Sequence, residues 1–245
     1  MTEETVRTQR GFIAFARAHR FATLLAALML MFFYGPIVQL FAQSLQPLVA
    51  RVGVGVSFTL MLLAAVFGVS NDRRLLWRTL LLAVPTIVAE LADVVFFTRE
   101  THIISHTLGA IFLFYVIVVL FRFIFSTKRV TEDTIYAALC VYLLAAVMWA
   151  LGYSLLSMYE DNAFYYSMSE QLPPDAMRFG AVPAGLEFYF SIVTMTTLGY
   201  GDIVPVSSAA RAMATFQAVV GQLYLAVLVA RLVGLHVAES ARKQD

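Results

Sequence analysis

Residues 194–202, which read TMTTLGYGD, form the stretch whose residue types and spacing are best suited to chemistry. Gly199 and Gly201 flank Tyr200, directly after a threonine run that closes an apolar segment. Because glycine tolerates φ angles on both sides of zero, its alternation with other residues lets successive carbonyls point the same way. A row of such carbonyls can replace the water shell of a dehydrated cation. Four chains around one axis would stack these oxygens into rings, with the Thr197 hydroxyls forming the innermost ring.

This stretch resembles the selectivity filter of potassium channels, whose usual core is Thr-Val-Gly-Tyr-Gly. Leu198 stands where that core has valine, which keeps an apolar residue for packing and leaves its carbonyl available. A glycine-rich turn after a helix is the simpler interpretation. However, Thr-Thr-x-Gly-Tyr-Gly-Asp fixes the residue at six positions, each with a usage of about 7% or less, so a chance match is very rare.

The resemblance implies a role for each residue of the stretch. The filter would consist of Thr197, Leu198, Gly199, Tyr200 and Gly201, with potassium bound at the first four. Its supporting residues would be Thr194, Thr196, Tyr189 and Asp202. Potassium is then the permeant ion, and no other cofactor is expected.

Composition indicates where such a stretch must lie. Of the 245 residues, 60% are hydrophobic and 13% are charged, and the mean hydropathy is +0.79. Soluble domains are about 45–50% apolar and about 25% charged, so we predict an all-α membrane protein with several spans. The single cysteine, Cys140, excludes an intrachain disulfide and a CxxC metal pair.

Six apolar stretches have about the 20 residues that a bilayer crossing requires. They are residues 21–43, 52–69, 75–97, 103–125, 134–157 and 208–236. The first follows four arginines as a signal peptide would, but it is too long for one and is interpreted as a retained span. The apolar piece 186–197 is too short to cross. A half-length helix followed by irregular backbone is tolerated at membrane depth only where it lines a cavity, so we expect a re-entrant pore loop.

The distribution of Lys and Arg predicts the orientation. Counted on alternate sides of the spans, 13 of the 17 basic residues fall on the side that holds residues 1–20 and 237–245. Both termini are therefore expected in the cytoplasm of a plasma membrane, with the pore loop entering from outside. Residues 126–133 form a linker in which Thr131 is placed to N-cap the following helix. Residues 158–185 are interpreted as an extracellular turret with no identifiable chemistry.

Residues 134–236 resemble the pore domain of tetrameric potassium channels. The expected parts are an outer helix 134–157, the turret 158–185, a pore helix 186–197, the filter 197–202 and an inner helix 208–236. Tyr189 and Phe190 would brace the filter, and Tyr189 could donate a hydrogen bond to Asp202, although plain apolar packing is the alternative for both. Gly221 matches a hinge glycine, with close packing against the pore helix as the alternative. Arg231 lies near the inner mouth, where lipid anchoring is the alternative.

Residues 21–125 resemble the voltage-sensor domain of the same superfamily, with one decisive departure. A voltage sensor requires arginines at every third residue of its fourth helix, and residues 103–125 contain only Arg122, at the inner end. We therefore predict a four-helix domain without gating arginines and a channel that is not gated by voltage through such a sensor.

Four ionisable residues are expected at similar depth in the outer half of this domain: Glu90, Asp93, His102 and His106. Ionisable groups inside a membrane domain are costly and commonly functional, so we hypothesise a polar cluster that senses external pH or a divalent cation. The alternative is a structural network that is satisfied by Arg51 or by hydroxyl groups.

The sequence thus predicts a homotetrameric, potassium-selective channel that conducts passively, because one chain supplies one filter segment. The alternatives are a weakly selective cation channel, a membrane-embedded enzyme or metal site, and a non-conducting regulatory subunit. No catalytic motif supports an enzyme. Beyond lipids and other copies of the chain, no nucleic acid or soluble partner is expected. Few residues follow the last span, which leaves no room for a cytoplasmic gating domain, and the compact length suits a bacterial membrane.

Overall fold

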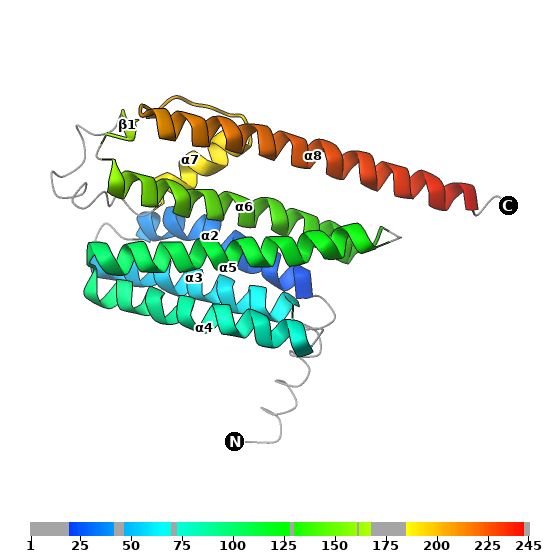
Figure 1. The fold of residues 1–245 in the computed structure, drawn as a ribbon, viewed down its shortest axis with the longest axis horizontal. Coiled ribbons are helices and arrows are strands. Elements are labelled where there is room, and N and C mark those ends of the chain that lie inside the picture. The colour runs from blue at the N-terminus through cyan, green and yellow to red at the C-terminus, as the bar shows by residue number, and fades with distance from the viewer. Residues whose placement is uncertain are drawn as a thin grey trace, which may run out of the picture.

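The computed structural model describes residues 20–41, 47–69, 73–127, 130–160, 162–167 and 185–242. Helices dominate the described chain (Figure 1). The six long ones are α2 (Arg20–Phe41), α3 (Pro47–Val69), α4 (Arg73–Phe96), α5 (Arg99–Ser126), α6 (Glu132–Tyr159) and α8 (Ser208–Arg242). The shorter elements are α7 (Leu186–Met195), β1 (Phe164–Tyr166) and β2 (Ile203–Pro205).

Four of the long helices, α4, α5, α6 and α8, have the length and hydropathy of membrane spans. The protein is an all-α membrane protein, as its composition predicts. In α2 and α3 the apolar stretches with described side chains are shorter, Arg20–Phe33 and Val52–Gly68. The count of six spans therefore stays a prediction.

Several helix ends differ from the apolar stretches. Helix α5 begins at Arg99 instead of residue 103 because Thr98 forms a capping box with Thr101. Helix α8 continues to Arg242, beyond the expected end at 236. Hydropathy marks the part of a helix that suits lipid, whereas backbone hydrogen bonding continues into polar residues. At α6 the predicted N-cap is confirmed, since the Thr131 side chain accepts from the backbone N–H of Thr134.

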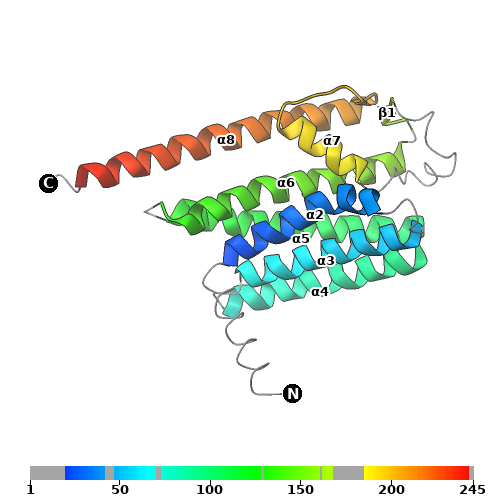
Figure 2. The same ribbon diagram turned by 180° about the vertical axis from the view of Figure 1, so that it is seen from behind.

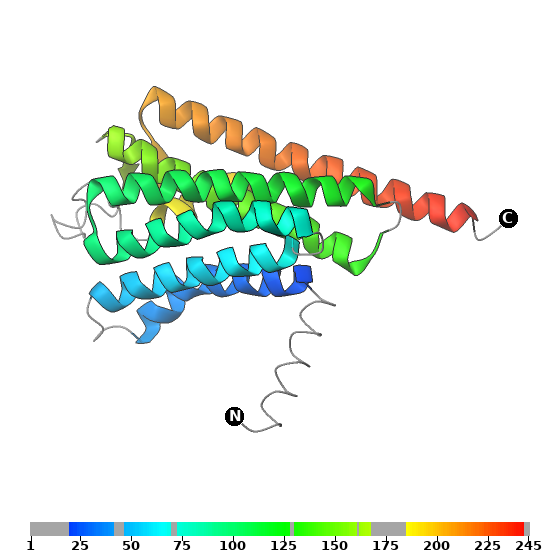
Figure 3. The same cartoon turned by 60° about the horizontal axis from the view of Figure 1, so that its bottom comes forward.

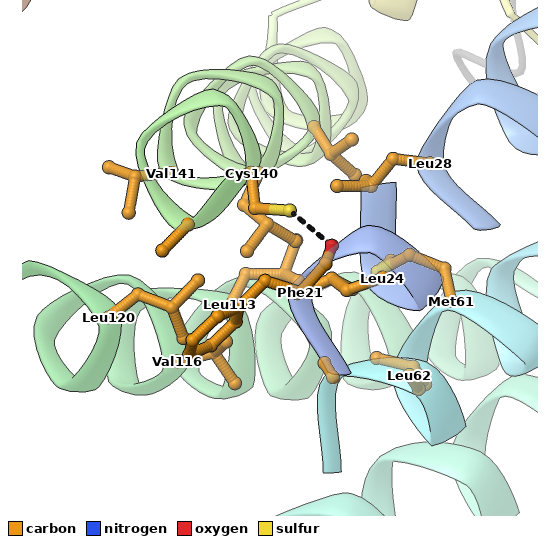
Figure 4. Close-up of a cluster of buried hydrophobic side chains, with 14 of the residues drawn as sticks. Phe21, Leu24, Leu28, Met61, Leu62, Leu113, Val116, Leu120, Cys140 and Val141 are labelled. Atoms are coloured by element: carbon orange, nitrogen blue, oxygen red, sulfur yellow. Dashed lines mark hydrogen bonds between the residues drawn. The ribbon is translucent and has the colours of Figure 1, made fainter. Parts of the chain in front are cut away.

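Helices α2–α5 form a four-helix domain that packs against α6 of the same chain (Figures 2 and 3). Helix α2 contacts both α3 and α6, and α5 contacts both α4 and α6. One apolar core fills the space between them, and Figure 4 shows part of it around Cys140. The Cys140 thiol donates to the backbone carbonyl of Phe21, at 3.4 Å, so α6 and α2 are joined at this point. The four-helix domain is thus built onto its own chain's outer helix.

A short antiparallel pair of strands connects the end of α6 to the segment that precedes α8. In it Phe164 pairs with Pro205 and Tyr166 pairs with Ile203. The side chains of Phe164, Tyr166 and Ile203 join a second apolar cluster with Tyr153 and Phe190. The sequence interpretation of 158–185 as a plain polar turret missed this pairing. The remainder of that prediction, residues 168–184, lies outside the described residues, as do residues 1–19.

Candidate ion-conduction site

The backbone after α7 has an alternating conformation. Helix α7 ends at Met195, two residues before the predicted end, and Thr196 is its C-cap. Thr197, Gly199 and Gly201 then have φ angles of +60°, +55° and +79°. Positive φ is uncommon for residues other than glycine, and a β-branched threonine adopts it rarely. The alternation expected from the two glycines is thus present, and it begins one step earlier, at Thr197, which ends the helix.

Hydrogen bonds hold the start and the end of this segment. The backbone N–H groups of Leu198 and Gly199 both point at the Val193 carbonyl, at 2.9 and 3.4 Å. At the other end the Tyr189 hydroxyl donates to Asp202 Oδ2, at 2.6 Å, which confirms the predicted bond. This hydrogen bond raises the pKa of Tyr189 to about 12, so its hydroxyl stays a neutral donor at physiological pH.

The threonines expected to support the filter lie around the end of α7. Thr196 donates its hydroxyl to the Ile192 carbonyl, at 2.7 Å, one turn back in the helix. The carbonyl of Thr194 accepts from the backbone N–H of Thr197, at 3.1 Å. The contact with Thr197 gives the Thr194 carbonyl at the helix end a partner, whereas the Ile192 carbonyl already accepts from the Thr196 backbone N–H, at 2.9 Å, and gains a second donor.

Two residues of the predicted filter are exposed in the structure. Leu198 is 55% exposed and Tyr200 is 68% exposed, although both carry large side chains with apolar surface. Helix α8 is also exposed: only 6% of its apolar stretch is buried within the chain, compared with 44% for α6. Its C-terminal half extends past the neighbouring helices (Figure 1). This face of the chain is therefore available to lipid or to further copies.

A buried hydrogen-bond network joins the three helices behind the filter segment. Gln217 of α8 is fully buried, and its Nε2 donates to the carbonyl and the hydroxyl of Ser191 on α7, at 3.0 and 2.7 Å. Its Oε1 accepts from the Tyr153 hydroxyl on α6. Ser191 in turn donates to the Ala146 carbonyl of α6, at 2.7 Å. The sequence interpretation missed this network, although a glutamine within an apolar helix is a signal for such a contact.

The carbonyl of Met195, at the C-terminal end of α7, is a second meeting point of the three helices. It accepts from the Tyr142 hydroxyl at 3.0 Å and from Gln222 Nε2 at 3.3 Å. A Cβ atom on Gly221 would lie 2.9 Å from Met195 Cγ and 3.1 Å from the Met195 carbonyl oxygen. The close-packing alternative for Gly221 therefore has its contact in the structure, and the hinge stays a prediction.

Arg231 makes contacts that the sequence did not indicate. Its guanidinium donates to the carbonyls of Phe125 and Thr127, both at 3.0 Å, and lies 4.8 Å from the centre of the Phe125 ring. These carbonyls are at the C-terminal end of α5, where the helix dipole favours a cation. Arg231 thus joins α8 to the end of α5, and its position at an inner mouth stays a prediction.

The four ionisable residues of the outer half lie close together, in two groups. His102 Nδ1 lies 2.8 Å from Asp93 Oδ2, and the rings of His102 and His106 lie with their centroids 3.8 Å apart and their planes tilted by 32°. Glu90 instead accepts from the Ser105 hydroxyl, at 2.6 Å. The hydroxyl partners of the structural alternative are thus present, whereas the side chain of Arg51 lies outside the described residues.

Comparisons with known proteins concern the second half of the chain. A family model described as "Ion channel" matches residues 154–236, which include β1, α7, the filter segment and most of α8. The "Potassium voltage-gated channel protein shk-1" of Caenorhabditis elegans is 42% identical over 59 residues. That match covers 24% of this chain and 10% of the relative, so the chain spans a small part of that protein's length. No solved structure matches the chain.

Proposed function

We propose that the protein is a potassium-selective channel, in which residues 197–201 form the conducting filter. The observation that carries this proposal is the alternation of left-handed backbone at Thr197, Gly199 and Gly201 directly after the end of α7. Such alternation orients successive carbonyls to one side, where they can replace the water of a monovalent cation. The end of α7 contributes its partial negative charge to the same region.

A complete filter in this proposal requires four copies of the chain. One chain supplies one filter segment, and carbonyls from one side alone cannot surround an ion. The exposure of Leu198 and Tyr200, and of most of α8, fits a protomer whose remaining partners are its own copies. Lipid would cover the outward faces of the four-helix domains, and the membrane would be the plasma membrane, with both termini cytoplasmic.

Conduction in this proposal is passive and independent of a voltage sensor. Helix α5 contains two arginines, and they lie at its opposite ends. Arg99 donates to the Met158 carbonyl at the end of α6, at 2.6 Å, which ties it to the pore half of the chain. A sensor moves several charges through the field, at about 2.3 kcal/mol per charge per 100 mV, and α5 has no series of them. Ion passage needs no catalytic residue, so we assign no enzymatic activity.

A channel of weak selectivity is the second candidate, and Leu198 is the residue that favours it. Leucine is larger than the valine of the usual filter core, and in an assembled filter its side chain would pack behind the carbonyls that contact the ion. A change of packing there could loosen the spacing of the oxygens.

Planar bilayers containing the purified protein test the proposal under opposed potassium and sodium gradients. We expect a reversal potential near the potassium equilibrium value, block by barium, and the same values for Leu198→Val. A reversal near zero in the wild type that moves to the potassium value in Leu198→Val would support the weakly selective channel. An absence of current from assembled wild-type protein in both directions of voltage would contradict conduction.

A further inference from the structure

The outer ends of α4 and α5 are joined by a very short connection. Only Phe97 and Thr98 lie between the two helices, which run side by side (Figure 1). Phe97 adopts a left-handed φ of +46°, and its N–H donates to the Asp93 carbonyl, at 2.9 Å. A large aromatic residue rarely adopts this conformation. The tight connection fixes Asp93, near the end of α4, beside the first turn of α5.

Each histidine of the group has one ring nitrogen occupied by a second partner. His106 Nδ1 donates to the His102 carbonyl, at 3.0 Å, which leaves the lone pair on Nε2. When His102 carries its proton on Nε2, which lies 3.3 Å from the Ser154 hydroxyl of α6, the lone pair on its Nδ1 faces Asp93 Oδ2, at 2.8 Å, and both atoms can bind one ion. Metal-binding histidines almost always donate their other N–H to a second partner, as His106 does to a carbonyl. Each ring thus has a partner for the N–H that a bound metal leaves in place.

Asp93 completes the group and is itself oriented. Its Oδ1 accepts from the Thr101 hydroxyl, at 2.9 Å, and Thr101 belongs to the capping box that starts α5. One potential ligand atom from each of Asp93, His102 and His106 lies within 4.8 Å of the other two. Asp93 is buried, whereas both histidines keep part of their surface exposed, and the group lies near the end of α4 and the start of α5.

We propose that Asp93, His102 and His106 bind a divalent transition-metal ion of the zinc class. Two imidazole nitrogens and one carboxylate oxygen are ligands of a zinc site that keeps a fourth position open. Magnesium and calcium select sites built from oxygen alone, so they fit this group poorly. The nearly stacked rings would repel each other if both were protonated, whereas two neutral rings can share one cation with the carboxylate.

Metal binding would also act on the contact between the two halves of the chain. Ligand atoms around one tetrahedral zinc lie about 3.4 Å apart, so His102 Nδ1 and Asp93 Oδ2, now 2.8 Å apart, must separate, while ligand atoms that are farther apart, up to 4.8 Å, must draw together. His102 cannot move toward the metal without changing its contact with Ser154 on α6, the helix that carries the pore half. Zinc at the outer surface should therefore alter conduction. This last step rests on the proposed channel function, while metal binding does not.

The first test measures binding to the purified full-length protein without reference to conduction. Isothermal titration with Zn²⁺ should give one ion per chain, and titration with Co²⁺ should produce the visible absorption of a tetrahedral site. Mg²⁺ should give no heat of binding. His106→Gln should weaken zinc binding by at least about tenfold, because even partners outside the ligand set contribute 10–100-fold. His236→Gln, which removes a histidine of α8 far along the chain, is the matched control.

Two results would overturn the proposal: no zinc uptake by the wild type, or equal affinity in the wild type, His106→Gln and Asp93→Asn. Asp93→Asn preserves the shape of the side chain. It therefore remains an informative variant if His106→Gln lowers the melting temperature of the metal-free protein. If both variants lose zinc binding but external zinc does not change the wild-type current, the metal site is supported and only its effect on the pore is contradicted.

Discussion

The two halves of the chain are held together by different kinds of contact. Behind the filter segment, Tyr153, Ser191 and Gln217 form directional hydrogen bonds among three helices. In the four-helix domain the shared core is aliphatic and aromatic, and the buried hydroxyls of Ser57 and Thr79 donate to carbonyls of their own helices. Irregular backbone needs partners for its polar groups, whereas regular helices satisfy their own and need only packing. The substitutions below separate these two modes of stabilisation.

The largest effect is expected from Gly199→Ala. A side chain at φ +55° costs about 1–2 kcal/mol in each copy and shifts the neighbouring carbonyls, so potassium flux from liposomes should fall below detection. Gly199 has open space around the Cβ position, so the effect would come from the backbone conformation. Gly234→Ala is the control, because that position on α8 is also open but has no left-handed backbone, and its flux should match the wild type. Normal flux through Gly199→Ala would refute the filter assignment.

Two tyrosine substitutions compare the halves directly. Tyr153→Phe removes the donor to Gln217 Oε1 and leaves a buried acceptor unsatisfied, which should lower the free energy of unfolding by about 1–3 kcal/mol. Tyr115 lies on α5, and its buried hydroxyl has no hydrogen-bond partner among the described residues. Tyr115→Phe should therefore be neutral or slightly stabilising. Denaturant unfolding in detergent measures both, and equal losses would remove the distinction between the two halves.

Two glycine substitutions sharpen the same comparison. In Gly221→Ala the new Cβ meets the Met195 backbone oxygen, and overpacking of this kind costs about 1–3 kcal/mol, partly offset by about 1 kcal/mol of helix propensity. In Gly109→Ala the nearest atom is the flexible end of Leu151, at 3.0 Å, so the two terms should nearly cancel. Thermal unfolding distinguishes these outcomes. A Gly221→Ala protein with wild-type stability but altered opening would instead support the hinge.

The last comparison concerns the pH dependence of stability. Burial raises the pKa of Glu187, at the start of α7, from 4.5 to about 8. Because the folded pKa lies above the unfolded value, the stabilising contribution is complete below about pH 4.5 and is lost as the pH rises through 8. The melting temperature should therefore fall between pH 6 and 9 in the wild type and change less in Glu187→Gln. Glu132→Gln, at an exposed carboxylate of α6, should retain the wild-type slope, and an identical slope in Glu187→Gln would contradict the assignment.

Residue spacing was sufficient to predict contacts that depend on the local geometry of a helix or a turn. The Thr131 cap and the alternation at Gly199 and Gly201 follow from short-range patterns, and the structure contains both. The bond from Tyr189 to Asp202, which the structure also contains, was implied by the resemblance to potassium channels. The closeness of Asp93 and His102 follows from their similar depth in two consecutive helices. In each case a helical repeat or a turn dictates the neighbour.

The missed contacts are those in which partners are chosen by packing between distant segments. In the sequence Gln217 is one polar residue within an apolar helix, and its spacing does not predict the hydrogen bond that it donates to Ser191. Arg231 likewise reads as a charge near a membrane surface, although it binds carbonyls of α5. The β1–β2 pairing joins strands too short to show a periodic pattern. Such contacts depend on how helices are rotated about their axes, which hydropathy does not specify.

The length of the α5–α6 connection determines how the protein can be assembled. Only residues 127–131 lie between Ser126 and Glu132, and such a segment spans about 20 Å at most. The four-helix domain therefore reaches the α6 of its own chain and cannot be exchanged onto a neighbour's. Each newly synthesised chain can complete these contacts before it meets another copy. Oligomers would then form by docking of finished subunits, and mixed assemblies could exchange members without unfolding any of them.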